Sequence, residues 1–333
     1  MSKLLETFEK GNVKLHNRII MPPMATAKSE KDGKVNQEIL DYYEDKSKGG
    51  YIALIIIEHS FVTQAGKASN NQLSIAEDSV VDKLKELANI IHKNGTKAVM
   101  QINHAGSAAN SEVTGLEVVG PSNVKNPRNG NLPRELTKLE INDIVKAFKA
   151  AAIRTKAAGF DGVEIHSAHG YLLNQFFSPL TNKRQDEYGG DVLGRIKLHL
   201  EIIKAIREAV GDEFTILLRL AASDYMEGGI TIEHSQVAVR EFEKAGVDIL
   251  DISGGFNGYT IKAVGNTEQG YFYPLTEAIK KQVSIPVILT GGITEAEAAE
   301  RLLTENKADL IGVGRAIYKD SNWAKNAVDK FRV

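Results

Sequence analysis

The chain has 333 residues, of which 42% are hydrophobic and 25% are charged, as in an ordinary water-soluble globular protein. Its 41 basic and 43 acidic residues give a net charge of −2 with no basic block, which argues against nucleic acid or an anionic membrane as the main partner. No cysteine is present, so the chain cannot hold an iron–sulfur cluster, whose ligands are cysteine thiolates.

The sequence carries no sign of export or of membrane insertion. Its first residues lack the apolar core of a signal peptide. The longest apolar run, Ile52–Ile57, is far too short to span a bilayer. We therefore expect a cytoplasmic protein.

Short β-branched runs alternate eight times with longer stretches of helical periodicity. Most of these runs lack polar alternation, which is typical of strands buried on both faces. The predicted strands are Ile19–Met21, Ala53–Ile57, Ala98–Ile102, Gly162–Ile165, Ile216–Leu220, Ile249–Ile252, Val287–Leu289 and Leu310–Val313. The predicted helices are Gln37–Lys48, Val80–Asn94, Glu140–Ala158, Leu193–Val210, Ile232–Ala245, Tyr273–Gln282, Glu295–Glu305 and Trp323–Phe331. Thr137 with Glu140, and Thr294 with Glu297, have the spacing of helix capping boxes.

This succession predicts an α/β fold, a (β/α)8 TIM barrel, as a single domain over residues 1–333. An open doubly wound sheet is the competing prediction, but the Gly-x-Gly-x-x-Gly fingerprint of that fold is missing after the first strand. Three long connections, 103–136, 167–192 and 253–272, follow strands. We expect them at the C-terminal face, where barrel active sites lie.

The segment that narrows the chemistry most follows the fourth predicted strand. His166 and His169 stand at its end, and Tyr171 follows a glycine that turns the chain. Two imidazoles and a phenol can hold an electron-rich oxygen and supply a proton. Two alternatives stay open: a pair of structural histidines, and a zinc pair, for which the sequence offers no evident further ligands. We expect no metal.

Glycine pairs and arginines mark other strand ends. Gly291-Gly292 and Gly314-Arg315 predict a phosphate site after the seventh and eighth strands, because close backbone amides and a guanidinium hold anions. Two simple tight turns are the alternative. Arg219 interrupts an apolar strand, so it has either a structural ion-pair partner inside the barrel or an anionic ligand, such as a reduced flavin deprotonated at N1.

Several segments combine into one pattern over nearly the whole chain. They are Asn17–Met24, Gln101-Ile-Asn-His104-Ala-Gly106, His166-Ser-Ala-His169-Gly-Tyr171-Leu, Ser178–Gly190 and Ile311–Arg315. In this order the chain resembles the old yellow enzyme family, NADH:flavin oxidoreductases that act as FMN-dependent ene-reductases. It is most similar to the short bacterial branch of that family.

The resemblance implies a barrel that holds FMN non-covalently and uses NADPH or NADH to reduce a small electrophilic alkene in a ping-pong cycle. It implies that His166 and His169 bind the carbonyl or nitro oxygen of the alkene, and that Tyr171 protonates the α-carbon. The cofactor-binding residues that it implies are Pro23, Met24 and Ala25 along the flavin ring, His59 beside it, Gln101 and Arg219 at the pyrimidine, and Gly291, Gly292, Gly314 and Arg315 at the phosphate.

Three positions depart from the family pattern. Ala25 stands where relatives commonly have a cysteine or threonine near the flavin C4 oxygen, and Ala27 where a substrate-facing tyrosine is frequent. His59 occupies a position that is usually small. Thr26 is expected to point away from the flavin if the strand persists. We expect an active flavin whose redox properties differ from those of the relatives.

Other functions and assemblies stay open. The alternatives are another FMN-barrel dehydrogenase, similar to dihydroorotate dehydrogenase, and a non-catalytic flavin-binding protein. A longer relative with a fused iron–sulfur segment is disfavoured by the missing cysteines and the short C-terminus. Relatives often form homodimers or homotetramers, and Arg332 is the one candidate for an arginine that completes a neighbour's site.

Overall fold

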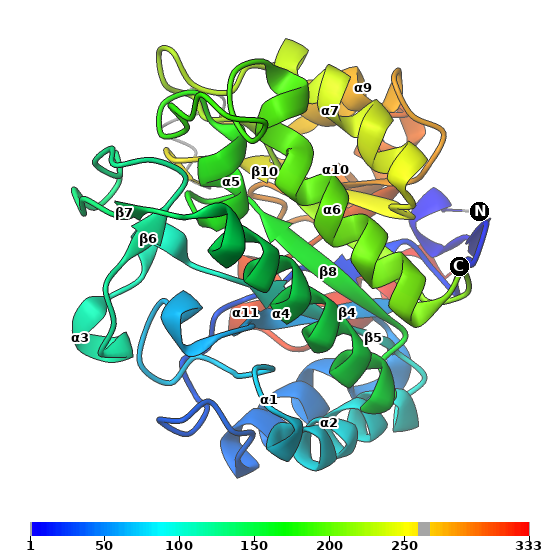
Figure 1. Ribbon diagram of the computed structural model, residues 1–333. Helices are drawn as coiled ribbons and strands as arrows, with labels where there is room; N and C mark the ends of the chain where they lie inside the picture. Colours follow the sequence, from blue (N-terminus) through cyan, green and yellow to red (C-terminus); the bar gives the residue numbers. More distant parts are fainter. Residues whose placement is uncertain (1, 259–266, 333) are drawn as a thin grey trace.

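The computed structural model describes residues 2–258 and 267–332. Within these ranges eight parallel strands close into a barrel in chain order, which confirms the predicted (β/α)8 class (Figure 1). The barrel strands are β3 (Ile19–Met21), β4 (Leu54–Phe61), β5 (Lys97–Asn103), β8 (Gly162–Ser167), β9 (Thr215–Ser223), β10 (Ile249–Gly254), β11 (Val287–Leu289) and β12 (Leu310–Gly312). Several of them run further toward their C-terminal ends than predicted, because polar residues continue the ladder there.

Helices follow the strands and cover the outside of the barrel, and Figure 1 shows α4 and α6 side by side across β8. The longer helices are α1 (Gln37–Ser47), α2 (Val81–Lys93), α4 (Lys138–Ala157), α6 (Val192–Val210), α7 (Ile232–Ala245), α9 (Tyr273–Lys280), α10 (Ala296–Thr304) and α12 (Trp323–Phe331). Short helices are α3 (Ser111–Thr114), α5 (Leu172–Phe177) and α11 (Arg315–Lys319), with 3-10 turns η1 (Lys3–Leu5), η2 (Lys48–Gly50), η3 (Gln64–Gly66), η4 (Asp78–Val80) and η5 (Gly106–Ala108). Of the helices described, none is both long and apolar enough to cross a membrane.

One of the two predicted capping boxes is present. The Glu140 backbone N–H donates to Thr137 Oγ1 at 3.3 Å, and the Thr137 N–H donates to the Glu140 carboxylate at 2.8 Å. The second prediction is wrong. The backbone N–H groups of Thr294 and Glu295 both donate to the side-chain oxygen of Gln269, so the chain is held extended there and α10 begins at Ala296.

The long predicted loops carry structure of their own. Residues 103–136 contain η5, α3 and a small sheet of β6 (Val119–Gly120) and β7 (Arg134–Glu135). Residues 167–192 contain α5. Part of the predicted loop 253–272 lies outside the described residues.

Strand alternation divides the buried side chains into two sets. On β8, Val163 and Ile165 pack outward in the large core beneath the helices, and Glu164 and His166 therefore face the barrel interior. On β5 the same alternation places Val99 in an interior cluster and turns Met100 outward. The interior thus holds apolar residues near the strand starts and polar residues near their ends.

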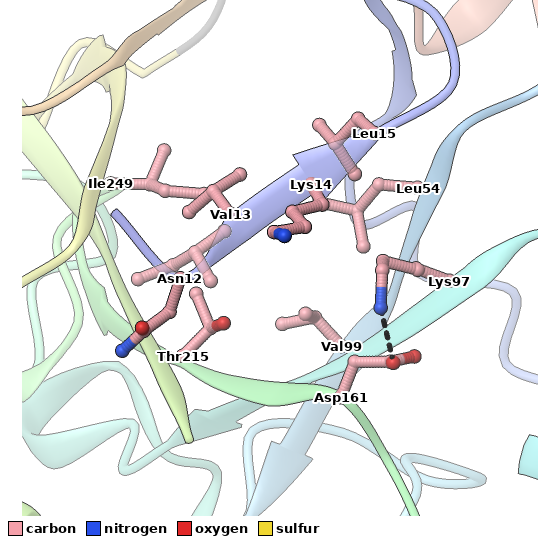
Figure 2. Close-up of a pocket in the computed structure, with 11 residues that line it drawn as sticks. Asn12, Val13, Lys14, Leu15, Leu54, Lys97, Val99, Asp161, Thr215 and Ile249 are labelled. Carbon is pink, nitrogen blue, oxygen red and sulfur yellow. Dashed lines mark hydrogen bonds and ion pairs between the residues drawn. The ribbon is translucent and has the colours of Figure 1, made fainter. Parts of the chain in front are cut away.

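An N-terminal hairpin that was not predicted closes the bottom of the barrel. Its strands are β1 (Phe8–Lys10) and β2 (Val13–Leu15), paired antiparallel. Its buried side chains pack with inward-facing residues of β3, β4, β5 and β9 to β12, in a cluster of Phe8, Val13, Leu15, Ile20, Ala53, Leu54, Ile56, Val99, Leu217, Ile249, Ile288 and Leu310. Figure 2 shows a pocket beside this hairpin, where the Lys97 ammonium lies 2.8 Å from the Asp161 carboxylate. The pocket is at the N-terminal ends of the strands, opposite the predicted site.

Replacing Leu217 by alanine should remove a fully buried contact with the hairpin and leave a cavity. We expect the free energy of unfolding, measured by urea titration, to fall by about 2–5 kcal/mol. The matched change Leu193→Ala, at a residue that is 51% exposed on α6, should alter it by no more than about 0.5 kcal/mol. Equal losses in the two variants would contradict the packing described above.

Candidate active site

His166 points into the barrel interior at the end of β8, with only 2% of its surface exposed. The Ala168 backbone N–H donates to His166 Nδ1 at 3.3 Å, so the neutral ring carries its proton on Nε2. Burial lowers the pKa of His166 well below its ordinary value, and the nearby His169 and Arg219 act in the same direction. The ring is therefore a neutral hydrogen-bond donor.

A tight, strained turn follows β8. His169 has φ of 60° and Gly170 has φ of 75°, so two successive residues are left-handed, a conformation that costs free energy for histidine. Polar contacts hold the turn: Arg128 Nη1 donates to the His169 carbonyl at 2.9 Å, and the Gly170 N–H donates to Asn174 Oδ1 at 2.7 Å. The turn places Tyr171 directly before α5.

Four aromatic side chains lie together at the C-terminal ends of the barrel strands, which form the rim of the barrel. The ring centroid of His166 lies 5.1 Å from that of His169 and 5.0 Å from that of Tyr171. The His59 ring on β4 lies 5.4 Å from Tyr171 and 6.4 Å from His166. His169 Nε2 lies 2.7 Å from the Ser253 hydroxyl on β10, which fixes the ring. The predicted catalytic residues are thus brought together, with His59 beside them.

A β-bulge brings His59 to this position. The register between β4 and β5 shifts between Ile57 and Ser60, so β4 advances three residues where β5 advances two. Such irregularities bend a strand and redirect its side chains. His59 and Glu58 lie within this bulge.

Gln72 fixes the tautomer of His59. The Ala68 backbone N–H donates to Gln72 Oε1 at 2.7 Å, so the amide nitrogen of Gln72 faces the other way and lies 2.7 Å from His59 Nδ1. His59 Nδ1 must accept this hydrogen bond, and the ring proton is on Nε2. Burial, with the charge of Arg219 adding, lowers the pKa of His59 to about 4. A further neutral imidazole donor therefore stands on the rim.

A buried polar layer lies inside the barrel, on adjacent strands. Gln101 Nε2 on β5 donates to Glu164 Oε1 on β8 at 2.8 Å, and Arg219 Nε on β9 lies 3.3 Å from Asp251 Oδ2 on β10. The ion pair expected as one alternative for Arg219 is thus present. Burial, then the charge of Asp251, raises the pKa of Glu164 well above its ordinary value. Burial also raises the pKa of Asp251, against the opposing effect of Arg219.

The last two strands and the first meet where the phosphate site was predicted. Gly291 and Gly292 have φ of 115° and 69°, and a Cβ on Gly292 would lie 2.8 Å from the Tyr271 ring. Arg315 Nη2 donates to the Tyr271 hydroxyl at 3.3 Å. A Cβ on Gly314 would lie 3.0 Å from Met24 Sδ. Larger residues could not replace these glycines without moving their neighbours.

The segment after β3 presents its backbone at the rim. Pro23 is half-buried and Ala25 is exposed, with no side-chain donor. Thr26 Oγ1 donates to Glu58 Oε1 at 2.7 Å, so the hydroxyl is engaged by a buried carboxylate. Ala27 is left-handed, with φ of 55°. Neither alanine side chain can donate or accept a hydrogen bond.

Sequence reasoning missed the buried carboxylates and Gln72. Glu164 and Asp251 each interrupt an apolar strand, as Arg219 does, and that signal could have found them. Asp224 accepts from the Ser178 hydroxyl at 2.6 Å and from the Phe256 N–H at 3.2 Å, joining two rim loops. No sequence pattern pointed to it.

The rim has the chemistry that FMN requires. Among the described residues, Arg219 Nε is buried without a hydrogen-bond partner, and so are the side-chain oxygen and nitrogen of Asn103 at the end of β5. These donors, the glycine pairs and Arg315 fit a ligand with an anionic ring edge and a phosphate. In residues 2–258 and 267–332, no group of three or more histidine, aspartate or glutamate side chains could hold a metal ion.

Comparison with known proteins identifies a family whose model matches this chain and several proteins with similar sequences. The model of the NADH:flavin oxidoreductase / NADH oxidase family matches residues 3–332. The NADH oxidase of Thermoanaerobacter brockii is 44% identical over 95% of this chain and 49% of its own length. The NADPH dehydrogenase of Clostridium acetobutylicum is 39% identical over 96% of this chain and 92% of its own. The chain therefore spans about half of some relatives and most of others.

Solved structures agree with the fold. A 2-naphthoyl-CoA reductase in complex with 2-naphthoyl-CoA superposes with a TM-score of 0.92 at 26% identity, over 98% of this chain and 52% of that one. The old yellow enzyme homologue from Zymomonas mobilis gives 0.85 at 26% identity, over 99% and 94%. Morphinone reductase in complex with tetrahydroNAD gives 0.84 at 25% identity, over 98% and 90%.

Nitrogen NMR of the histidine rings tests the tautomers. We expect His59 and His166 to remain neutral with the proton on Nε2 from about pH 8 down to about pH 5.5, whereas imidazoles of the urea-unfolded chain titrate near 6.5. Gln72→Leu removes the donor to His59 Nδ1, so His59 alone should lose its preference for the Nε2–H tautomer. An Nδ1–H form of His59 in the unmodified protein would refute this assignment.

Proposed function

Because the chain belongs to the NADH:flavin oxidoreductase / NADH oxidase family, we propose that it is an FMN enzyme that uses NADPH or NADH to reduce activated C=C bonds. The acceptors would be α,β-unsaturated carbonyl or nitro compounds. When bound, FMN supplies the hydride. The single FMN-binding barrel would span residues 1–333 in the cytoplasm, and could assemble as a homodimer or homotetramer.

The observation that carries the proposal is the neutral imidazole pair beside a phenol. His166 and His169 would donate hydrogen bonds to the carbonyl or nitro oxygen of the acceptor. This stabilises the negative charge that gathers on that oxygen when hydride reaches the β-carbon. Neutral donors suit the task, because they need no counter-ion when the site is empty. Tyr171, 5.0 Å from His166 between ring centroids, would protonate the α-carbon.

The other rim residues would hold the cofactor. Gln101 and Arg219 would bind the pyrimidine edge, where the guanidinium offsets charge on the reduced ring. The backbone of Pro23, Met24 and Ala25 would line the ring, with His59 beside it. Gly291, Gly292, Gly314 and Arg315 would bind the phosphate. Both the nicotinamide and the acceptor would then use the same face in turn, which accounts for a ping-pong cycle and for the missing dinucleotide fingerprint.

Anaerobic half-reactions test the function. The purified protein should be yellow, NADPH or NADH should bleach it, and 2-cyclohexenone should restore the colour in the absence of oxygen. A protein that binds FMN without being bleached would be a passive flavin-binding protein. Recolouring by orotate, with no response to the enone, would favour a dehydrogenase similar to dihydroorotate dehydrogenase.

Tyr171→Phe should slow the reoxidation of the bound flavin by 2-cyclohexenone by about 10²–10⁴-fold, because the proton donor is lost. Bleaching by NADPH should change little, since that half-reaction needs no proton at an α-carbon. Stopped-flow measurement of the flavin absorbance separates the two steps. Equal slowing of both would show that Tyr171 is not the donor.

Arg315→Ala should raise the dissociation constant of FMN by about 10–100-fold, the loss expected for one charge-assisted contact. Arg301→Ala, on the exposed side of α10, is the matched control and should leave it unchanged. Fluorescence titration of the flavin-free protein gives both values. An unaltered constant in Arg315→Ala would place the phosphate elsewhere.

A further inference from the structure

The two carboxyl groups inside the barrel have no task in the reaction proposed above. Asp251 is fully buried, and neither of its oxygens has a hydrogen-bond partner among the residues that the structure describes. The separation of 3.3 Å from Arg219 Nε is an ion-pair distance without hydrogen-bond geometry. Glu164 Oε2 is likewise buried without a partner. Buried polar atoms left in this way call for an explanation.

The charges of the groups in this layer explain why the carboxyl oxygens lack hydrogen-bond partners. Arg219 is the positive group of the layer, and two carboxyl groups face it, Asp251 from β10 and Glu164 from β8. On the other side of Asp251, β11 presents Ile288, which cannot titrate. In a region of low dielectric constant a net charge is costly, so the layer is neutral when Glu164 is protonated and Asp251 is ionised. The raised pKa of Glu164, caused by burial and by Asp251, agrees with this assignment.

We propose that Asp251 is a positioning residue that orients the Arg219 guanidinium toward the flavin and takes up a second proton when the flavin is reduced. This rests on the proposed place of Arg219 at the pyrimidine. The hydride brings two electrons and one proton and leaves the reduced ring with one negative charge. Arg219 then lies between two anions, the reduced ring and the Asp251 carboxylate. A proton from solvent that binds to a carboxylate oxygen of Asp251 restores neutrality in the layer.

The buried environment of Asp251 supports this step. Burial raises the pKa of the Asp251 carboxyl to about 6, although Arg219 opposes the change. A new negative charge on the far side of Arg219 would weaken that opposition and raise the pKa further. Between the two values, reduction of the flavin therefore binds two protons, and below or above that window it binds one.

The test is the midpoint potential of the FMN-loaded protein between about pH 5 and pH 9, followed by dye-equilibrated spectroscopy. Uptake of one proton with two electrons gives a slope of about 30 mV per pH unit, and uptake of two gives about 59 mV. The unmodified protein should show the steeper slope above about pH 6. Asp251→Asn should show the shallow slope throughout, with a higher potential at alkaline pH because Arg219 has lost its counter-charge.

Two variants separate the possible failures. Glu164→Gln should keep the pH range with the steep slope. If this variant lost the steep slope, the second proton would bind to Glu164, and the assignment to Asp251 would be overturned. Arg219→Gln should lower the potential; no change would remove Arg219 from the flavin and overturn the proposed cofactor site with the inference. A steep segment that survives in Asp251→Asn while Arg219→Gln shifts the potential would overturn the inference alone. If Asp251→Asn fails to hold FMN, a single shallow slope in the unmodified protein would still refute it.

Discussion

The parallel alignment of all eight barrel strands makes every strand end on the same rim, and the rest of the molecule depends on that constraint. His59, Gln101, His166 and Arg219 come from four different strands, and none is close to the next in sequence. Parallel pairing makes them neighbours, because β4, β5, β8 and β9 are adjacent in the sheet. Two register shifts, in β4 at Ile57 to Ser60 and in the pairing of β9 with β10 at Ser253, then adjust individual side chains on a rim that is otherwise regular.

The barrel could be predicted because its signal is repeated. Each buried strand is a short apolar run, and each helix has one apolar face, so errors in a single boundary leave the order intact. The strand ends were placed too early, at Ile57 and Ile165 for example, because polar residues there hid the continuing ladder. The capping box at Thr294 failed for a different reason: Gln269, distant in sequence, takes the backbone N–H groups that the motif would have used.

The candidate site was predictable where residue type alone implies chemistry, as for His166, His169 and Tyr171. It was not predictable where a role depends on a partner. Nothing near Gln72 in the sequence indicates that it sets the tautomer of His59, since the contact needs the bulge in β4 and the Ala68 amide. Asp251 was overlooked for the opposite reason, because a single acidic residue in a strand has many explanations until Arg219 is seen beside it.

The hairpin at the barrel floor has a consequence for biosynthesis. Phe8, Val13 and Leu15 bury themselves against Leu217, Ile249, Ile288 and Leu310, which leave the ribosome roughly 200 to 300 residues later. Until then only the early members of their native cluster, such as Ile20, Leu54 and Val99, have been synthesised. The growing chain would therefore carry a partly exposed apolar segment through most of translation, and nascent-chain chaperones shield segments of this kind. Full packing of the hairpin against the barrel would be among the last steps of folding.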